Sequence, residues 1–231
     1  VVVGAGPTGV ELAGALGEIG LHTLAKDFRT IDPTRVEVLL VEGNPRVLGG
    51  FTPKLGAAAE ASLGRRHVTV RCNTKVTEVD ADGVEVQLAD GRRERIDART
   101  VLWAAGVKAS PLAASLGVPL DGAGRVKVEG DLSIPGHPEV FVVGDLAACA
   151  FDGKPVPGVC QGAIQGGRHA ARMIRADLAA GKRAPFRYKD KGSLATIGRA
   201  SAVAQIGARS HHGFFAWLLW WVIHIFYLIG F

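Results

Sequence analysis

Cysteine is scarce in this sequence of 231 residues, and its three copies lie far apart. Cys72, Cys149 and Cys160 form no Cys-x-x-Cys pair and show no metal-ligand spacing, so we predict no metal site. An odd number of separated cysteines is typical of a reducing compartment and argues against a disulfide-stapled domain. We interpret each of them as a small buried side chain.

The sequence also lacks repeats, low-complexity tracts and a strong charge of either sign, and we expect no signal peptide. Its net charge of +5 comes from 27 basic and 22 acidic residues and does not suggest a nucleic-acid partner. With 48% hydrophobic residues the chain can build a core. Both ends fall inside apolar runs, so we expect a piece of a longer protein.

One glycine motif stands out near the beginning of the chain. An apolar run at residues 1–3 leads into Gly4-x-Gly6-x-x-Gly9 and then into a helical pattern. In a dinucleotide-binding turn the first glycine allows the turn, the second lets the backbone approach a pyrophosphate, and the third lets helix and strand pack closely. The pyrophosphate would lie at the helix N-terminus, which favours anions. The alternative is an ordinary strand, turn and helix without a ligand.

A second apolar strand, residues 36–41, ends in Glu42. A carboxylate at this place accepts hydrogen bonds from the adenosine ribose hydroxyls and would repel a 2′-phosphate. The interval from Gly9 to Glu42 exceeds the usual spacing of about 20 residues. We interpret the polar residues 26–35 as an insertion that accounts for the excess.

The rest of the first half predicts alternating helices and strands with a small antiparallel element. A buried strand at residues 99–106 ends in Ala105 and Gly106, which either allow a ligand to approach or simply pack in the core. We expect helices at residues 7–20 and 52–63, an extension or second helix at 21–28, a strand at 68–70, and a hairpin of residues 75–80 and 84–88.

The second half holds further polar candidates on regular elements. A buried strand at residues 140–145 ends in Gly144-Asp145, and Asp145 either contacts a ligand at the strand end or caps the next helix. Gln161 and Gln165 share one face of a predicted helix at residues 160–180, where the alternative is a pair of solvated amides. We also expect two short strands within residues 191–207.

The last residues, 213–231, contain no Asp, Glu, Lys or Arg. A spanning helix needs about 20 apolar residues, so length alone does not exclude one. Side chains with polar tips recur at helical spacing, which favours a helix lying at a membrane surface over a buried core helix. Seven basic residues between 182 and 209, against Asp190 alone, would attract anionic lipid. The recurring positions are Trp217, Trp220, Trp221, His224, Tyr227 and Leu228.

Together these motifs resemble the type II NADH dehydrogenases, which are NADH:quinone oxidoreductases of the two-dinucleotide-binding flavoprotein superfamily. Cys160 departs from the pattern, because the family more often has alanine there. The resemblance rests on Gly-Ala-Gly-Pro-Thr-Gly-Val-Glu at residues 4–11, Trp-Ala-Ala-Gly at 103–106 and Phe-Val-Val-Gly-Asp at 141–145. It also rests on Asp-Phe-Arg-Thr-Ile-Asp-Pro at 27–33, Cys-Gln-Gly-Ala-Ile-Gln-Gly at 160–166 and the aromatic tail.

The resemblance implies an α/β chain in three parts. Residues 1–106 would form a Rossmann-type NAD(H)-binding domain with a parallel sheet and a small antiparallel element. Residues 107–191 would be the C-terminal part of an FAD-binding domain, and residues 192–231 a hairpin with an apolar membrane-associating helix. In the family a first glycine motif, which holds the ADP half of FAD, precedes these parts. It is absent here, so we expect the chain alone to lack tightly held FAD.

The implied activity is hydride transfer from NADH to FAD, followed by two-electron reduction of quinone without proton pumping, at the cytoplasmic face of a membrane. Gly4, Gly6, Gly9 and Glu42 would bind NADH, with Ala105 and Gly106 beside the cofactor. Gly144 and Asp145 would bind FAD, Asp145 through a ribityl hydroxyl. Gln161 and Gln165 would offer neutral amides to the quinone and the flavin edge. Glu11 would contact substrate, unless it is only a first-turn acid stabilised by the helix dipole.

Two other classes of protein remain open from the sequence. One is a different two-dinucleotide flavoprotein, such as a sulfide:quinone or disulfide reductase, for which Cys149 and Cys160 are the only conceivable reactive pair. The other is a non-catalytic, membrane-associated dinucleotide-binding module. The sequence also leaves a homodimer open.

Overall fold

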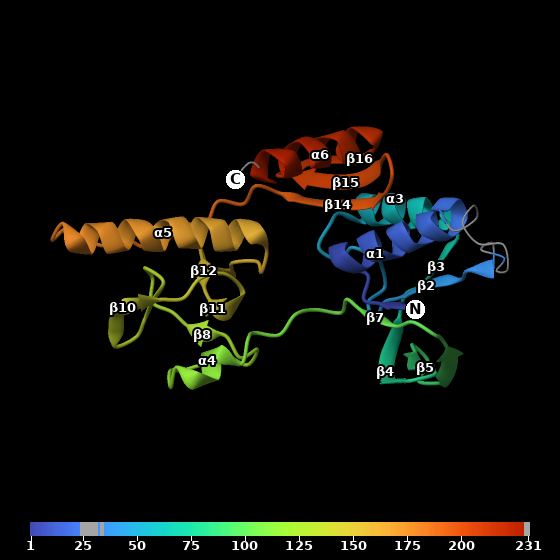
Figure 1. Ribbon diagram of the computed structural model, residues 1–231, viewed down its shortest axis with the longest axis horizontal. Coiled ribbons are helices and arrows are strands. Elements are labelled where there is room, and N and C mark those ends of the chain that lie inside the picture. Colours follow the sequence, from blue (N-terminus) through green and yellow to red (C-terminus); the bar gives the residue numbers. More distant parts are fainter. Residues whose placement is uncertain (24–31, 33–34, 229–231) are drawn as a thin grey trace. The chain divides into compact units, whose positions relative to one another are not determined.

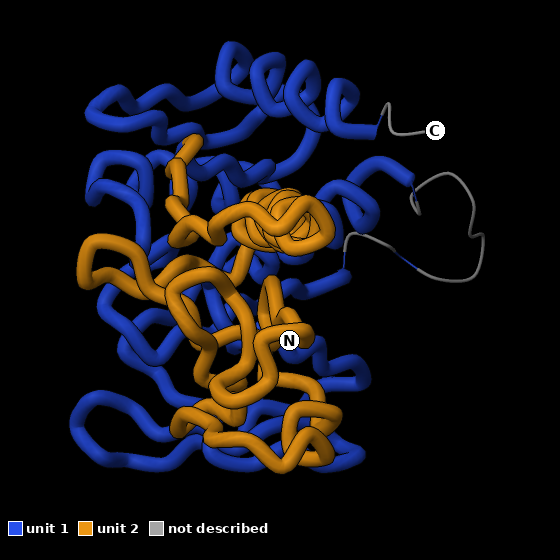
Figure 2. The backbone as a smooth tube through the Cα atoms, turned by 90° about the vertical axis from the view of Figure 1, so that its left-hand side faces the viewer, with its two compact units in different colours: residues 1–106, 192–231 blue, residues 107–191 orange. Residues whose placement is uncertain are grey.

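A computed structural model describes residues 1–23, 32 and 35–228. The chain divides into two compact units, residues 1–106 with 192–231 and residues 107–191, which Figure 2 colours separately. Residues 192–231, which we predicted as a region of their own, therefore pack with the first unit. The expected helix at 21–28, the insertion at 26–35 and the family motif at 27–33 lie largely outside the described residues.

The first unit is built on a four-stranded parallel sheet in the order β3-β2-β1-β7 (Figure 1). Short β-branched runs form these strands, and Val2 and Leu40 at the centre are fully buried. The sheet confirms the predicted α/β, Rossmann-type fold. The strands are β1 (Val2–Val3), β2 (Val38–Val41), β3 (Val68–Arg71) and β7 (Leu102–Trp103).

Alternate residues of these strands face two different layers, as the period of two requires. Val2 and Leu40 pack against α1 (Pro7–Glu18) and α3 (Pro53–Gly64). The odd-numbered Val41 packs with Val84 and Val86 of a three-stranded antiparallel sheet. That sheet comprises β4 (Thr74–Asp80), β5 (Gly83–Leu88) and β6 (Arg93–Asp97). The predicted hairpin is confirmed, whereas β6 was not predicted because its sequence is almost entirely charged.

A second antiparallel sheet covers α1 and α3 from their other side. It comprises β14 (Ser193–Gly198), β15 (Ser201–Ile206) and β16 (Arg209–Gly213). Val203 faces the helices, and its neighbours Ala202 and Ala204 face α6 (Phe214–Leu228). Small side chains on this face let α6 lie close to the sheet.

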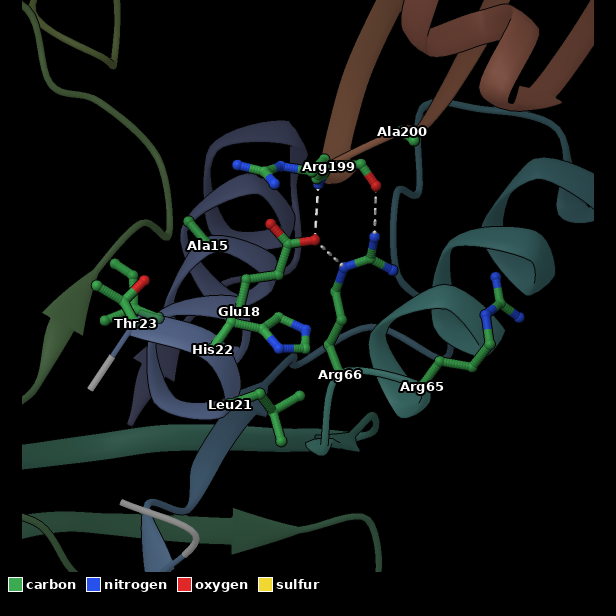
Figure 3. A pocket seen from close by; sticks show the side chains of 10 residues that line it. Ala15, Glu18, Leu21, His22, Thr23, Arg65, Arg66, Arg199 and Ala200 are labelled. Atoms are coloured by element: carbon green, nitrogen blue, oxygen red, sulfur yellow. Dashed lines mark hydrogen bonds and ion pairs between the residues drawn. The ribbon is translucent and has the colours of Figure 1, made fainter. Parts of the chain in front are cut away.

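An ion-pair latch joins three of these elements beyond the C-terminal end of α1 (Figure 3). Arg66 Nε donates to Glu18 Oε1 at 2.9 Å, and Arg66 Nη1 donates to Ser62 Oγ at 2.8 Å. Arg66 Nη2 donates to the Arg199 carbonyl at 3.0 Å, while the Arg199 amide donates to Glu18 Oε1 at 2.7 Å. Because only 12% of the Arg66 side chain is exposed, breaking this latch would leave a poorly solvated charge.

Replacing Gly198 with alanine is expected to lower the free energy of unfolding by about 2–3 kcal/mol. An added Cβ would lie 2.3 Å from Arg66 Nε and 2.5 Å from Glu18 Oε1, and the backbone φ is +121°. Urea unfolding measures the effect. Gly207→Ala is the control, because Gly207 also has a positive φ but nothing lies within 4 Å of an added Cβ. An equal loss of stability in both variants would mean that the loss comes from backbone strain alone and that the contacts of Arg66 and Glu18 contribute nothing.

The second unit contains short strands around one long helix, and its small core includes Ala113, Val126, Ile134 and Val142. Its helices are α4 (Leu112–Ser115), the 3₁₀ turn η3 (Gly144–Leu146) and α5 (Cys160–Leu178). Its strand pairs are β8 (Val126–Lys127) with β11 (Ala147–Ala148), β9 (Ser133–Ile134) with β10 (His137–Phe141), and β12 (Ala150–Phe151) with β13 (Lys154–Pro155).

Two strands predicted as buried are more exposed than we expected. The run at 140–145 forms only the end of β10, with Val140 37% exposed and Val142 buried. The run at 99–106 forms β7, at the edge of its sheet, with Trp103 60% exposed. Both predictions were wrong for one reason: an apolar run shows that burial is favourable, but not that a neighbouring layer covers both faces.

Among the described residues, helix α6 is covered on one face only. Ala216, Trp217 and Leu219 pack on the sheet, so Trp217 does not belong to an outward face as predicted. Many large apolar side chains on the rest of the helix are exposed, among them Phe214, Phe215, Leu218, Trp221, Val222, Phe226 and Leu228. Within residues 1–23, 32 and 35–228, no helix combines the length and the apolarity that crossing a membrane requires.

Candidate dinucleotide-binding and redox site

The glycine turn between β1 and α1 has no room for a side chain at Gly4 or Gly9, but it has room at Gly6. Gly4 has φ +94°, and a Cβ there would lie 2.7 Å from the Ala105 Cα. A Cβ on Gly9 would lie 1.7 Å from the Gly4 carbonyl oxygen. A Cβ on Gly6, in contrast, would meet nothing within 4 Å. Gly4 and Gly9 are therefore required by the fold, whereas Gly6 leaves open space at the N-terminus of α1.

Glu42 lies at the end of β2 and contacts this turn directly. Its Oε2 accepts a hydrogen bond of 2.6 Å from the Ala5 amide. Its Oε1 accepts from the Asn44 amide at 2.8 Å and from Asn44 Nδ2 at 2.7 Å. A carboxylate has about four acceptor positions, so three bonds leave one for a ribose hydroxyl. The predicted ribose contact thus has an available acceptor next to the turn.

Ala105 and Gly106 follow β7 and border the same turn. Both residues are exposed, and Gly106 has φ +101°. The Ala104 amide donates to the Val3 carbonyl at 2.7 Å, and this hydrogen bond holds the backbone before Ala105 next to β1. Small side chains here keep the side of the turn accessible, as the sequence suggested.

Glu11, in α1, is bonded to a strand far away in the sequence. Its Oε1 accepts hydrogen bonds from the Thr196 amide at 3.0 Å and from Thr196 Oγ1 at 3.3 Å. Part of the role of Glu11 is therefore to join α1 to β14, and its substrate contact stays a prediction. Thr196 was missed because no local pattern links positions 185 residues apart.

In the second unit, Gly144 and Asp145 lie at the start of the turn η3. Gly144 has φ +68°, and an added Cβ would lie 3.1 Å from the Ala163 Cβ of α5. Asp145 is exposed, and one of its carboxylate oxygens lies 3.2 Å from the position of a Cβ on Gly158. Gly144 thus permits close packing on α5, and Asp145 keeps an accessible carboxylate.

Gln161 and Gln165 are four residues apart on α5 but differ in their contacts. Gln161 Oε1 is buried and has no hydrogen-bond partner among the residues that the structure describes. The side chain of Gln165 makes two hydrogen bonds to the backbone of Lys189. Gln165 Nε2 donates to the Lys189 carbonyl, and Gln165 Oε1 accepts from the Lys189 backbone N–H, each at 3.0 Å. A buried, unpaired acceptor costs about 1–3 kcal/mol, which points to a missing donor at Gln161. Gln165 instead holds the chain after α5.

The cysteines show no pair suited to disulfide chemistry. All three are free thiols, but Cys160 is exposed and Cys72 and Cys149 are only half-buried, so the interpretation of each as a buried side chain was wrong. Burial raises the pKa of the Cys149 thiol, and burial together with Glu60 and Glu42 raises that of Cys72. A raised pKa disfavours the thiolate, which is the reactive form.

A cavity of the first unit is lined by residues outside the glycine turn. Its volume is about 720 Å³, and it adjoins the latch of Glu18 and Arg66 (Figure 3). None of the predicted site residues lines it. We therefore place the candidate site by the contacts of the turn and not by cavity size.

The chain matches the model of the pyridine nucleotide-disulphide oxidoreductases over residues 1–167. It is 50% identical to the type II NADH:quinone oxidoreductase Ndh of Mycobacterium tuberculosis, over all of this chain and 50% of that protein. It is 32% identical to the type II NADH:quinone oxidoreductase of Staphylococcus haemolyticus, over 92% of this chain and 52% of that protein. The chain thus spans about half the length of these relatives, and the resemblance found in its motifs is confirmed.

Among solved structures, NDH2 of Plasmodium falciparum in complex with NADH superimposes with a TM-score of 0.90 at 17% identity. The match covers 99% of this chain and 62% of that one. At this identity the likeness concerns the fold. With the family model matching well over half of its residues, the chain belongs to the pyridine nucleotide-disulphide oxidoreductase family.

Proposed function

We propose that this chain is the NADH-binding part, with the adjoining flavin and quinone elements, of a flavin-dependent NADH:quinone oxidoreductase that pumps no protons. The observation that carries the proposal is the open space at Gly6, at the N-terminus of α1, beside the carboxylate of Glu42. The 50% identity to a type II NADH:quinone oxidoreductase supports the choice of reaction.

The first unit would bind and orient NADH. Free amides at the start of α1 would bind the pyrophosphate, because they point out of the helix and the dipole favours an anion. Glu42 would accept from the ribose, and the small residues Ala105 and Gly106 would let the nicotinamide approach. The carboxylate of Glu11 would contact the substrate from α1, and its hydrogen bond from Thr196 would hold it in position.

The second unit offers groups that fit a flavin and a quinone. FAD, when bound, would supply the hydride acceptor and pass two electrons to the quinone. Asp145 would accept from a ribityl hydroxyl, and Gly144 would keep the backbone close to α5. Gln161 Oε1 is buried with no partner in the described part of the chain, and this is the observation that favours a ligand here. A neutral amide orients its partner without adding charge to the site.

The cysteines argue against the main alternative within the family. A disulfide reductase needs a thiolate, and burial raises the pKa of the Cys149 thiol. A reaction with quinone needs no protein thiol. We therefore favour quinone as the electron acceptor over a disulfide or a sulfide.

We also propose that α6 attaches the protein to the surface of a membrane, at the cytoplasmic face. Its uncovered side carries Phe214, Trp221 and Phe226, each more than half exposed. Arg209 precedes it on β16, where a cation near an anionic surface contributes about 1 kcal/mol. A lipid-soluble quinone would be available at the same membrane surface. A homodimer stays a prediction from the sequence.

The chain is expected to bind NADH more tightly than NADPH, because the Glu42 carboxylate would repel a 2′-phosphate. Glu42→Gln should reduce the preference by roughly tenfold or more, because it removes a negative charge that would repel the 2′-phosphate. Fluorescence titration with both nucleotides measures it. Glu37→Gln, the same change at an exposed position, is the control and should leave the preference unaltered. Equal affinities of the unmutated chain for both nucleotides would refute the role of Glu42.

The proposed activity is tested in the whole protein by steady-state NADH oxidation with a soluble quinone, a disulfide or sulfide as the second substrate. We expect turnover with quinone alone. Turnover with disulfide would favour the reductase alternative. Binding of NADH without turnover on any acceptor would favour a non-catalytic module.

A further inference from the structure

The loop between β2 and α3 is tied to a single arginine side chain. Arg46 Nη1 donates to the Phe51 carbonyl at 2.8 Å and to the Leu48 carbonyl at 3.3 Å. Arg46 Nη2 donates to the Gly49 carbonyl at 2.7 Å. A planar guanidinium can serve several acceptors in fixed directions at once. The loop therefore folds around this side chain and takes its shape from it.

This loop, like Glu42, is hydrogen-bonded to Ala5 of the glycine turn. The Leu48 amide donates to the Ala5 carbonyl at 2.8 Å, while the Ala5 amide donates to Glu42 at 2.6 Å. The residue between Gly4 and Gly6 is thus bonded at both its N–H and its C=O. Any displacement of Leu48 would move the backbone that faces the open space at Gly6.

Leu48 needs support to keep its conformation. It is fully buried and has φ +51°, in the left-handed region that is unfavourable for a residue with a Cβ. The Phe51 amide donates to the Leu48 carbonyl at 2.8 Å, and Arg46 Nη1 donates to the same oxygen. The bonds from Arg46 therefore help to keep Leu48 in a conformation that it would otherwise leave.

We propose that Arg46 is a positioning residue for the pyrophosphate of the bound dinucleotide, acting through Leu48 and Ala5 without touching the ligand. This inference rests on the proposed function, because it assumes that the turn binds a dinucleotide. Because the Nη atoms of Arg46 are engaged by backbone carbonyls, the side chain serves the loop and does not supply a cation for a 2′-phosphate.

The test compares the binding of two probes, ADP-ribose and adenosine. Both contain adenosine, but only ADP-ribose contains the pyrophosphate. Arg46→Met should weaken binding of ADP-ribose to the chain by roughly tenfold, because a small shift of a positioning group is costly. Binding of adenosine, followed by NMR titration, should hardly change. Arg46→Lys should recover part of the loss, since one ammonium nitrogen cannot span all three carbonyls. Arg65→Met, at an exposed arginine that ends α3, is the matched control.

A merely structural role gives a different result. Equal weakening of both probes, or no weakening of either, would overturn the proposal. If Arg46→Met does not fold, Arg46→Lys is tested in the same way, by comparing its loss of affinity for ADP-ribose with its loss of affinity for adenosine. In the whole protein, the KM for NADH should rise while kcat at saturating NADH stays the same. Failure of the proposed function would appear in the unmutated chain, as no binding of NADH or ADP-ribose.

Discussion

Replacing Gly6 with alanine is expected to weaken NADH binding strongly and to leave the stability of the chain unchanged. The new Cβ would meet no protein atom within 4 Å, so it disturbs no packing. It would occupy the space where the pyrophosphate comes close to the backbone. We expect the dissociation constant to rise roughly 100-fold, as for a misplaced reactant. Isothermal titration with NADH and thermal unfolding of the same sample measure the two quantities.

Gly9→Ala should do the opposite and damage the fold first. Its Cβ would lie 1.7 Å from the Gly4 carbonyl oxygen, so backbone must move against backbone. We expect a loss of about 3–5 kcal/mol in the free energy of unfolding. Gly64→Ala, at the open end of α3, should change neither the affinity for NADH nor the stability of the chain. Tight NADH binding by the Gly6 variant would show that the pyrophosphate does not lie at this turn.

Gln161→Ala is expected to slow the quinone half of the reaction in the whole protein and to spare the NADH half. The buried oxygen of Gln161 has no partner among the described residues, and an N–H group of the flavin would complete it. That bond would orient the amide so that its Nε2–H donates to a quinone carbonyl. Losing a neutral hydrogen bond costs about 0.5–1.5 kcal/mol, which corresponds to a several-fold to tenfold slower reoxidation. Stopped-flow absorbance follows flavin reduction by NADH and reoxidation by quinone separately.

Gln165→Ala is the matched comparison, because it removes the same amide four residues later. Its two bonds to Lys189 hold the chain after α5, so we expect lower stability of residues 107–191 and a smaller, indirect effect on reoxidation. A slower reduction by NADH in the Gln161 variant, with normal reoxidation, would place Gln161 on the NADH side.

The parts of the fold that could be predicted are those with a strong local pattern. The spacing of Gly4, Gly6 and Gly9 after a β-branched run predicted the strand, turn and helix, and the alternation of 75–80 and 84–88 predicted the hairpin. Glycine spacing and period-two burial act over a few residues, so one sequence reveals them.

The parts that could not be predicted depend on distant partners. The bond between Glu11 and Thr196 joins α1 to β14, and the contacts of Arg66 join three elements. The exposure of Trp103 depends on β7 lying at an edge of the sheet. The sequence also gave the two glutamines of α5 the same role, since nothing local shows that Lys189 occupies one of them.

The most direct measurement is a single turnover of the whole protein in a stopped-flow spectrophotometer. Anaerobic mixing with NADH should bleach the flavin absorbance, and a second mixing with quinone should restore it. NADPH should bleach it much more slowly. Bleaching that only a disulfide reverses, or no bleaching by NADH, would contradict the assignment of this chain to an NADH:quinone oxidoreductase.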